Sequence, residues 1–241
     1  DGLMAGASLD RAAKLAGRVS GDSTVAYALA FARAVEAALE AEVPPRAAYL
    51  RALMAEVERL AHHLGDIGAV CNDASFGLLQ AHFAVLREQV LRAAHSCFGH
   101  RLMRDRILPG GVAADLDGSG AAVLRDLATF IETRLAALVE IYDETASLQD
   151  RTVGTGILAP ALARRFGAGG YVGRASGHEA DARKTPGYAP YPALRFDVPM
   201  LEAGDVNARV WIRIREVEQS LSLLRQILDA LPAGDIATEV R

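Results

Sequence analysis

Two serines three positions apart, Ser20 and Ser23, come directly before a run of residues that is typical of a helix. Gly21 and Asp22 lie between them, so the segment has the spacing at which metal-binding proteins place a pair of cysteines. Serine and aspartate are also favoured helix caps, worth about 1 kcal/mol. The segment therefore has two interpretations: an ordinary helix start, or a metal site in which hydroxyls stand where thiols would bind.

A glutamate and two histidines form a second candidate. Glu58 and His62 are four residues apart, and a helix would place them on one face. Such a pair can bind metal or transfer protons. A polar seam between packed helices, which would include His63, is the interpretation that we favour.

The sequence HSCFGH contains His95, Cys97 and His100. A metal site needs three or four converging ligands, and nothing nearby in the sequence supplies the rest. A catalytic Cys–His pair has no supporting sequence context either. We interpret the cluster as the end of a helix with a buried thiol.

The most suggestive cluster is GRASGHEADARK, residues 173–184. It combines Ser176, His178 and Asp181 with Arg174 and Arg183, among glycines that let the backbone approach a ligand closely. The two arginines could grip an anion or a carboxylate through paired N–H groups. A solvated, charged loop is the alternative, and residue types alone do not decide between the two.

The composition of the 241 residues favours helices packed on helices, because 51% are hydrophobic and only 6% are aromatic. The net charge of −4 argues against a nucleic-acid-binding protein, which would carry a basic excess. Cys71 and Cys97 are too few and too far apart for a disulfide framework, so a reduced, cytoplasmic setting is expected. No apolar run approaches the roughly 18 residues that cross a membrane, and there is no signal-peptide pattern.

Apolar residues recur at three- and four-residue steps in four long segments, and each such segment is expected to be a helix with one buried face. Two shorter helices are expected before them. The expected helices are residues 8–17 and 23–40, a segment from Pro45 through Ile67, residues 76–98, a segment ending near Leu148, and residues 205–231.

Glycine and proline interrupt this pattern twice. Residues 106–120 are expected to hold a short strand, and residues 149–204 form a long irregular excursion of the kind that often carries function. The sequence thus predicts a mainly α fold, a bundle of long helices with a small irregular or β excursion, in one domain over residues 1–241. Because the chain begins with Asp1 rather than Met, we expect it to be a piece of a longer protein.

Five sequence blocks occur in order along nearly the whole chain. They are EVPPRAAYLRALMAEVERLAHHLGDIGAV, PGGVAADL, RTVGTGIL, GRASGHEADARK and GDVNARVWIRIREVEQSLSLL. Together they resemble the large subunit of membrane-bound, energy-converting nickel–iron hydrogenases of the formate hydrogenlyase type. They equally resemble the hydrogenase-like subunit of respiratory complex I, the NADH–quinone oxidoreductase. The resemblance implies a long-helix bundle with a small β component.

Catalytic members of this family hold nickel and iron with two Cys-x-x-Cys motifs. The first lies at the start of the second helix, and the second lies beyond the position of Arg241. An ungapped alignment places Ser20 and Ser23 at the two cysteines of the first motif. A hydroxyl stays protonated at neutral pH and is a hard, weak donor, whereas these metals favour thiolates. We therefore expect the nickel–iron centre to be absent and no metal to be bound by this chain.

Members in complex I also lack these cysteines. In these members, the resemblance implies a quinone cavity beside an iron–sulfur cluster that a neighbouring subunit holds. The tyrosine that contributes to this cavity corresponds to Gly21 here, and its partner histidine lies upstream of Asp1. Quinone binding is therefore allowed, but the residues of this chain do not support it.

The resemblance also implies that residues 173–184 lie near the ancestral site. The expected vestigial-pocket and conformational-coupling residues are Ser20, Gly21, Asp22, Ser23, Arg174, Ser176, His178, Asp181 and Arg183. Asp22 is a candidate proton relay. The expected role is a redox-complex subunit that docks against an iron–sulfur small subunit and membrane-arm subunits, peripheral on the inner face of the membrane. A non-catalytic scaffold and a free-standing helical binding module are the alternatives, and the isolated chain is not expected to be catalytic.

Overall fold

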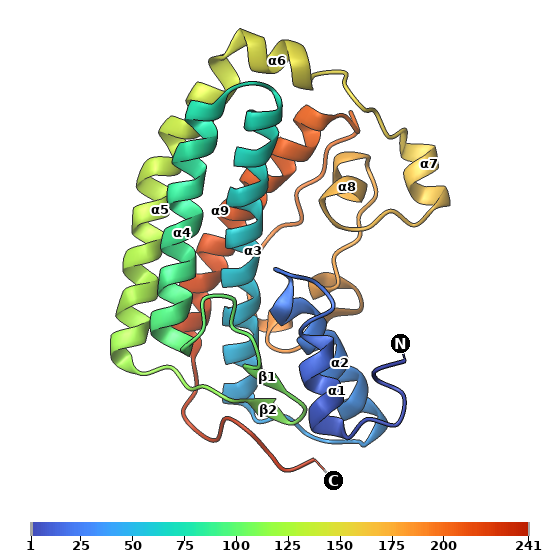
Figure 1. Ribbon diagram of the computed structural model, residues 1–241, viewed down its shortest axis with the longest axis vertical. Coiled ribbons are helices and arrows are strands. Elements are labelled where there is room, and N and C mark those ends of the chain that lie inside the picture. The colour runs from blue at the N-terminus through green and yellow to red at the C-terminus, as the bar shows by residue number, and fades with distance from the viewer. Residues whose placement is uncertain (1, 241) are drawn as a thin grey trace. The chain divides into compact units, whose positions relative to one another are not determined.

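The structure, a computed structural model, describes residues 2–240 and is mainly helical with a small β component (Figure 1). This confirms the fold class expected from the sequence. Two helices open the chain and four long ones follow. They are α1 (Leu9–Ala16), α2 (Thr24–Ala38), α3 (Pro45–Asp73), α4 (Gly77–Phe98), α5 (Gly118–Glu144) and α9 (Val206–Ala230).

The two segments that interrupt the long helices both contain short elements. Strands β1 (Ile107–Leu108) and β2 (Gly111–Val112) form an antiparallel hairpin where a strand was expected. The excursion after α5 holds short helices and single turns. They are α6 (Ala146–Thr152), α7 (Pro160–Arg165), α8 (Gly170–Ala175), the π-type turn η1 (Arg183–Gly187) and the 3-10 turn η2 (Tyr191–Ala193).

One predicted helix boundary is wrong. We expected the fifth helix to continue to about Leu148, but α5 ends at Glu144 and Leu148 belongs to α6. Thr145 lies between them in an extended conformation, with φ −80° and ψ 95°, which interrupts the helical hydrogen bonding. The apolar pattern continues across this break because Leu148 is buried as well.

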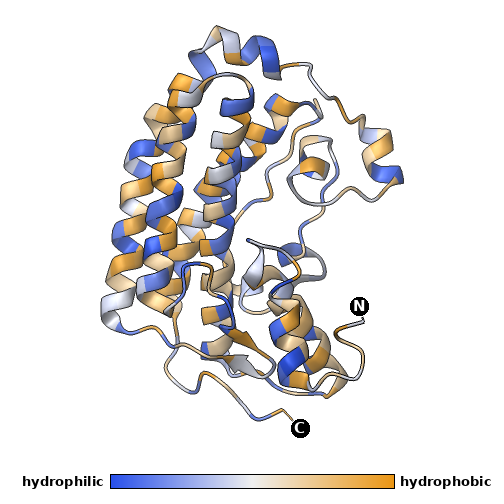
Figure 2. Ribbon diagram, in the orientation of Figure 1, coloured by the Kyte–Doolittle hydropathy of each residue, from blue (hydrophilic) through white to orange (hydrophobic). Residues whose placement is uncertain are grey.

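The long helices form because each carries an apolar stripe that is removed from water. Figure 2 shows hydrophobic and hydrophilic residues alternating along each of them, as expected for helices with one buried face. Two positions that the apolar spacing predicted to be buried, Val206 and Leu231 at the ends of the last expected helix, are only half-buried. The other predicted positions are buried: Leu50, Leu53, Met54, Val57, Leu60, Leu64 and Ile67 in α3, Leu79, Phe83, Leu86 and Val90 in α4, Leu124, Leu127, Ile131, Leu135, Leu138 and Tyr142 in α5, and Val210, Ile214, Val217, Leu221, Leu224 and Leu228 in α9.

The chain divides into two compact units, and each of the four long helices contributes a part to both. The first unit comprises residues up to Glu58, Val90–Leu127 and the chain from Leu224 onward. The second comprises Arg59–Gln89 and Ala128–Leu223. Within residues 2–240, no helix is both long enough and apolar enough to cross a membrane.

A buried ion pair joins α2, α3 and the hairpin in the first unit. The Nη1 atom of Arg51 lies 3.0 Å from the Oε2 atom of Glu36. Arg51 also donates to the carbonyl of Leu108 at 2.5 Å, and the Gly110 N–H donates to Glu36 at 2.7 Å. The hairpin is therefore fixed to the two helices by charge-assisted hydrogen bonds.

The C-terminal segment of the first unit runs against the hairpin at its glycines. The Val112 N–H donates to Ile236 at 2.9 Å, and the Thr238 N–H donates to Gly110 at 3.0 Å. A Cβ atom at Gly111 would lie 2.2 Å from the carbonyl oxygen of Ile236. Only glycine allows this close approach of two backbones.

Candidate functional site

The turn before α2, in the first unit, brings Ser20, Asp22 and Ser23 together. The Ser20 hydroxyl donates to the Oδ1 atom of Asp22 at 2.8 Å, and the Ser23 N–H donates to the Ser20 oxygen at 3.4 Å. Gly21 and Asp22 are exposed, whereas the two serines are half-buried. A Cβ atom at Gly21 would have no neighbour within 4 Å, so the turn has open space at this position.

The start of α2 is capped differently from what the sequence indicated. Ser23, one of the two expected capping residues, occupies the N-cap position, but its side chain makes no capping hydrogen bond. Instead the carboxylate of Glu58, on α3, accepts the N–H groups of Val25 at 2.6 Å and Ala26 at 2.9 Å. A buried negative charge satisfies these free donors and interacts favourably with the positive end of the helix dipole. Glu58 therefore anchors the start of α2 to α3.

The donor atoms of this turn do not match the chemistry of a nickel–iron centre. Ser20, Asp22 and Ser23 offer hard oxygen atoms, whereas nickel and low-spin iron favour thiolates. Gly21, between them, offers no side chain at all. Among residues 2–240, no three His, Cys, Asp or Glu side chains converge in a way that could hold a metal ion.

The segment 173–184 lies in the second unit, so the candidate residues fall into two groups in two units. Arg174 is buried; its Nε atom lies 2.5 Å from the Oε1 atom of Glu216, and it also donates to the Ala180 carbonyl at 2.7 Å. Arg183 is buried too, and its Nη2 atom donates to Asp181 at 2.7 Å. Both guanidinium groups are thus bound within the protein, which does not favour the idea that they grip an external anion.

The two remaining candidates of this segment contact backbone or packed side chains. The His178 ring is 2.8 Å from the carbonyl oxygen of Ala168, which makes its Nδ1 atom the donor. Ser176 is completely buried, and its hydroxyl has no hydrogen-bond partner among the described residues. The segment is therefore an internally connected loop rather than the solvated loop that was the alternative interpretation.

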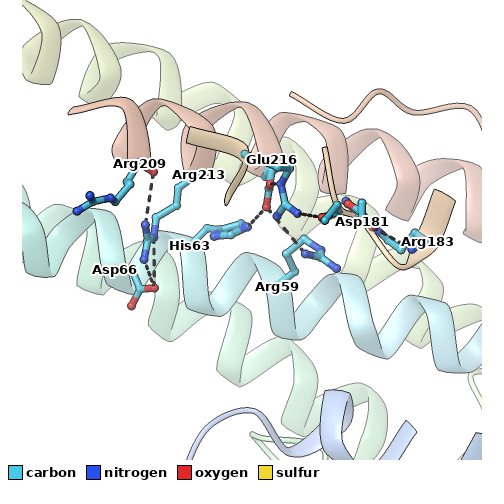
Figure 3. Close-up of polar contacts among 10 residues, drawn as sticks. Arg59, His63, Asp66, Asp181, Arg183, Arg209, Arg213 and Glu216 are labelled. Carbon is cyan, nitrogen blue, oxygen red and sulfur yellow. Dashed lines mark hydrogen bonds and ion pairs between the residues drawn. The ribbon is translucent and has the colours of Figure 1, made fainter. Parts of the chain in front are cut away.

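Glu216, on α9, is the centre of a buried polar cluster (Figure 3). Its carboxylate is fully buried and accepts from Arg174 on one side and from the Nε2 atom of His63, 2.7 Å away, on the other. Arg59 approaches the same carboxylate at 3.9 Å. The cluster therefore connects α3, α9 and the segment 173–184, and His63 lies in the polar seam between helices that the sequence indicated.

A second pair extends this cluster along the same two helices, as Figure 3 shows. The Nη2 atom of Arg213, on α9, lies 3.0 Å from the Oδ2 atom of Asp66, on α3. The guanidinium group of Arg213 also lies 3.3 Å from the centre of the Tyr171 ring. Tyr171 belongs to α8, so stacking on the ring connects this helix to α9.

The protonation states follow from burial and neighbouring charges. Burial alone would raise the pKa of Glu216, but the hydrogen bonds from His63 and Arg174 and the charge of Arg174 outweigh it and lower the pKa to about 2. The pKa of His63 is lowered, chiefly because the ring is buried, although Glu216 acts in the opposite direction. Burial would also raise the pKa of Asp181, yet Arg183 outweighs it and lowers the pKa. The cluster thus has an ionised carboxylate beside a neutral imidazole at neutral pH.

The HSCFGH segment ends a helix, as expected. Helix α4 ends at Phe98, and the Nδ1 atom of His100 accepts the N–H groups of Leu102 at 3.1 Å and Arg104 at 3.3 Å. Cys97 is half-buried, with its sulfur 3.5 Å from the Gly120 carbonyl. The pKa of its thiol is raised to about 11, mainly by burial, which does not suit a nucleophile.

Sequence reasoning did not identify Glu216 or the Arg213–Asp66 pair. A signal was present, because Arg213 and Glu216 are charged residues beside the apolar positions Ile214 and Val217. Charged side chains that fall within a buried stripe must find partners there. The partners themselves were not recognisable, since His63 is 153 positions away from Glu216.

Comparison with known proteins agrees with the resemblance seen in the sequence. Residues 58–241 match the family described as the respiratory-chain NADH dehydrogenase 49-kDa subunit. Formate hydrogenlyase subunit 5 of Escherichia coli K12 is 34% identical over 225 residues, which cover 93% of this chain and 40% of that protein. An NADH-quinone oxidoreductase subunit of Desulfotalea psychrophila is 35% identical over 218 residues, covering 90% of this chain and 58% of that protein.

A third relative is the carbon monoxide-induced hydrogenase of Rhodospirillum rubrum, which is 34% identical over 205 residues, 85% of this chain and 57% of that protein. The chain thus spans about half the length of the curated relatives that it matches. The family match covers most of the chain and includes α9 and the segment 173–184. The chain belongs to the family of the 49-kDa subunit of respiratory-chain NADH dehydrogenase.

Proposed function

We propose that this chain is the hydrogenase-like large subunit of a membrane-associated redox complex, and that its ancestral nickel–iron site is lost. The relatives at about one-third identity are subunits named for formate hydrogenlyase and NADH-quinone oxidoreductase. In this complex the chain docks against an iron–sulfur subunit, which holds the cluster, and lies at the inner face of the membrane through membrane-arm partners.

The observation that carries the loss of the metal site is the hydrogen bonding of the turn before α2. The Ser20 hydroxyl donates its proton to Asp22 and its oxygen accepts from the Ser23 backbone, so this oxygen is engaged within the turn. A neutral hydroxyl held in this way is a poor ligand for a soft metal.

Metal analysis of the full-length protein, matured in its own host, tests this part of the proposal. We expect less than about one-tenth of a nickel per chain, with iron only in proportion to iron–sulfur clusters of partner subunits. Stoichiometric nickel in the purified complex would overturn it. A nickel–iron hydrogenase large subunit prepared in the same host is the positive control for maturation.

A conformational-coupling role is a second candidate, and the Glu216 cluster favours it. One carboxylate joins α3, α9 and the segment 173–184, so a displacement of this segment must break or move charge-assisted hydrogen bonds. Buried polar elements with two discrete arrangements are suited to transmit change between sites. Measuring turnover of the complex with quinone and with hydrogen distinguishes a redox subunit from a non-catalytic one. A complex that has neither activity supports the scaffold role.

Quinone binding is an alternative function of the same fold. It would require the turn before α2 to contact a quinone without the tyrosine that the family uses, since Gly21 stands there. Gly21→Tyr is the informative variant, because the open space at this position accommodates a side chain. An increase in quinone-dependent turnover in this variant, relative to Gly21→Ala, would support a cavity at this turn.

A further inference from the structure

We propose that the segment from Val153 to Phe166, called the docking arm, is a docking surface for a partner protein whose apolar patch is rimmed by aspartate and glutamate. The inference rests on the proposed function, because the partner is another subunit of the same complex. It goes further by assigning the surface and the chemistry of its partner.

Large apolar side chains are exposed along the whole docking arm. The exposed fractions are 53% for Val153, 62% for Ile157, 43% for Leu162 and 73% for Phe166. A single exposed phenylalanine or isoleucine is common on protein surfaces, but four large apolar residues within one short segment indicate a surface that is covered in the functional state.

The first half of the docking arm is held in place by the start of α9. The Leu158 N–H donates to the Gly204 carbonyl at 2.9 Å, and the Val206 N–H donates to the Thr155 carbonyl at 3.0 Å. The side chain of Arg209 donates to the Gly156 carbonyl as well. The apolar side chains are therefore presented on a backbone that is fixed before any partner binds, which lowers the entropic cost of binding.

The second half is held by the residues after α7. The Ala168 N–H donates to Ala163 at 2.9 Å, and the His178 ring donates to the Ala168 carbonyl at 2.8 Å. A Cβ atom at Gly173 would lie 1.9 Å from that same carbonyl, so the close contact requires glycine. His178 therefore acts as a positioning residue for the docking arm.

The charge of residues 151–178 indicates the chemistry of the partner surface that fits the docking arm. Residues 151–178 contain no aspartate or glutamate, although the whole chain has a net charge of −4. Arg164 and Arg165 are exposed at the end of α7, and the Arg165 guanidinium lies 5.6 Å from the centre of the Phe166 ring. Arginine and aromatic side chains are enriched where protein interfaces gain most of their affinity. An apolar surface rimmed by carboxylates is complementary to this arrangement.

A protein is favoured over a membrane as the occupant. Helices that bind in the plane of a membrane combine a long apolar face with many basic residues. Helix α7 has only six residues, and the docking arm carries only two arginines. Its apolar side chains are moreover spread over a rigid loop as well as the helix, as expected of a shape-specific contact.

Site-specific photo-crosslinking in the full-length protein, purified within its complex, tests the proposal. A photoreactive residue at position 166 is expected to crosslink one partner subunit, at a peptide that contains aspartate or glutamate. Arg164→Glu combined with Arg165→Glu is expected to reduce the fraction of chain bound in the complex at least tenfold. Changing the crosslinked acidic residue of the partner to lysine should restore binding of this double variant. Leu78→Ser, at a residue 66% exposed on α4, is the matched control and is expected to assemble normally.

The outcomes separate this inference from the function on which it rests. If the charge-reversed variant assembles like the wild type, the docking arm is not an interface and the proposal is overturned, while the redox-complex assignment stands. Crosslinks to lipid alone would identify a membrane contact and would equally overturn it. If the wild type itself does not copurify with an iron–sulfur subunit, the proposed function fails and this inference fails with it.

Discussion

The Oε1 atom of Glu216 lies 2.5 Å from the Nε atom of Arg174, although 42 positions separate the two residues. Both side chains are almost completely removed from water, so their charges interact at low dielectric. The contact connects the middle of α9 to the end of α8. It makes the irregular segment a part of the core of its unit.

The first prediction concerns this carboxylate. Glu216→Gln leaves Arg174 buried without an opposite charge, and the expected loss of unfolding free energy is about 3 kcal/mol. Urea denaturation measures it. Glu218→Gln, at an exposed position on the same helix, is the control and should change the free energy by less than about 0.5 kcal/mol. Equal urea midpoints for the two variants would contradict the role of Glu216.

The second prediction concerns the pH dependence of stability. In the unfolded chain His63 regains its ordinary pKa of 6.5, whereas in the folded protein this pKa is lowered, mainly by burial. As the pH falls below 6.5, the unfolded state takes up a proton before the folded state does, so stability decreases. His63→Gln should make this decrease smaller without abolishing it, because burial and neighbouring arginines lower the pKa of His100 as well. Urea midpoints between about pH 7.5 and about pH 5.5 will show the difference.

Glu216 contributes a second loss of folding stability, at more acidic pH. Its pKa of about 2 in the folded protein is below the ordinary value of 4.5, so its stabilisation is complete above pH 4.5 and is lost as the pH falls toward about 2. Glu216→Gln should abolish the loss of stability below pH 4.5 and should leave the loss that His63 causes below pH 6.5. A stability profile of the His63→Gln variant that still declines from pH 6.5 like the wild type would contradict the assignment.

The third prediction distinguishes two helix caps. Glu58→Ala removes the acceptor of the Val25 and Ala26 N–H groups and should cost about 2 kcal/mol, because buried donors lose their partner. Ser23→Ala should cost less than about 0.5 kcal/mol, since Ser23 makes no capping bond. Hydrogen exchange at Val25 and Ala26 should accelerate only in the first variant. The reverse order of the two costs would restore the cap expected from the sequence.

The fourth prediction concerns the thiols. The pKa of Cys71 and that of Cys97 are each about 11, mainly because burial disfavours the thiolate. At about pH 8 alkylation should therefore be roughly a hundredfold slower than for a free cysteine. Unfolding in urea should bring both residues to the ordinary rate, which is the internal control. Rapid labelling of native Cys97 would reopen the catalytic Cys–His interpretation.

The fifth prediction uses the glycine at the hairpin. Gly111→Ala places a methyl group 2.2 Å from the Ile236 carbonyl, so the C-terminal segment must move away. The expected destabilisation is about 1–3 kcal/mol, with faster hydrogen exchange at Val112 and Thr238. Gly118→Ala, where a Cβ atom has no neighbour within 4 Å, is the matched control. Unchanged exchange in Gly111→Ala would contradict the close backbone contact.

The long helices were predictable because their signal is local and periodic. The apolar positions Leu53, Leu64 and Val217 follow from three- and four-residue spacing, and all are buried. Glycine and proline positions also indicated a short strand in residues 106–120, but not that two strands would pair there as a hairpin. The short helices α6, α7 and α8 did not, since each is too brief to give a periodic pattern.

Only part of the polar cluster was named from the sequence: Glu216, its centre, was missed, and none of the partners was identified. Arg174 and Asp181 were named from residue types, yet their interactions depend on long-range packing that no local pattern encodes. The cap of α2 illustrates this, because Glu58 lies 33 positions from the N–H group that it binds. A charged residue inside an apolar stripe indicates that a partner exists, without identifying it.

A carboxylate on α3 caps the start of α2, so the side chains of Ser20 and Ser23 contribute little to the stability of this helix. Other small side chains can therefore replace Ser20 and Ser23 while α2 keeps its start. Because the anchor of the helix lies on another element, the residues of this turn can change their chemistry without a large loss of stability.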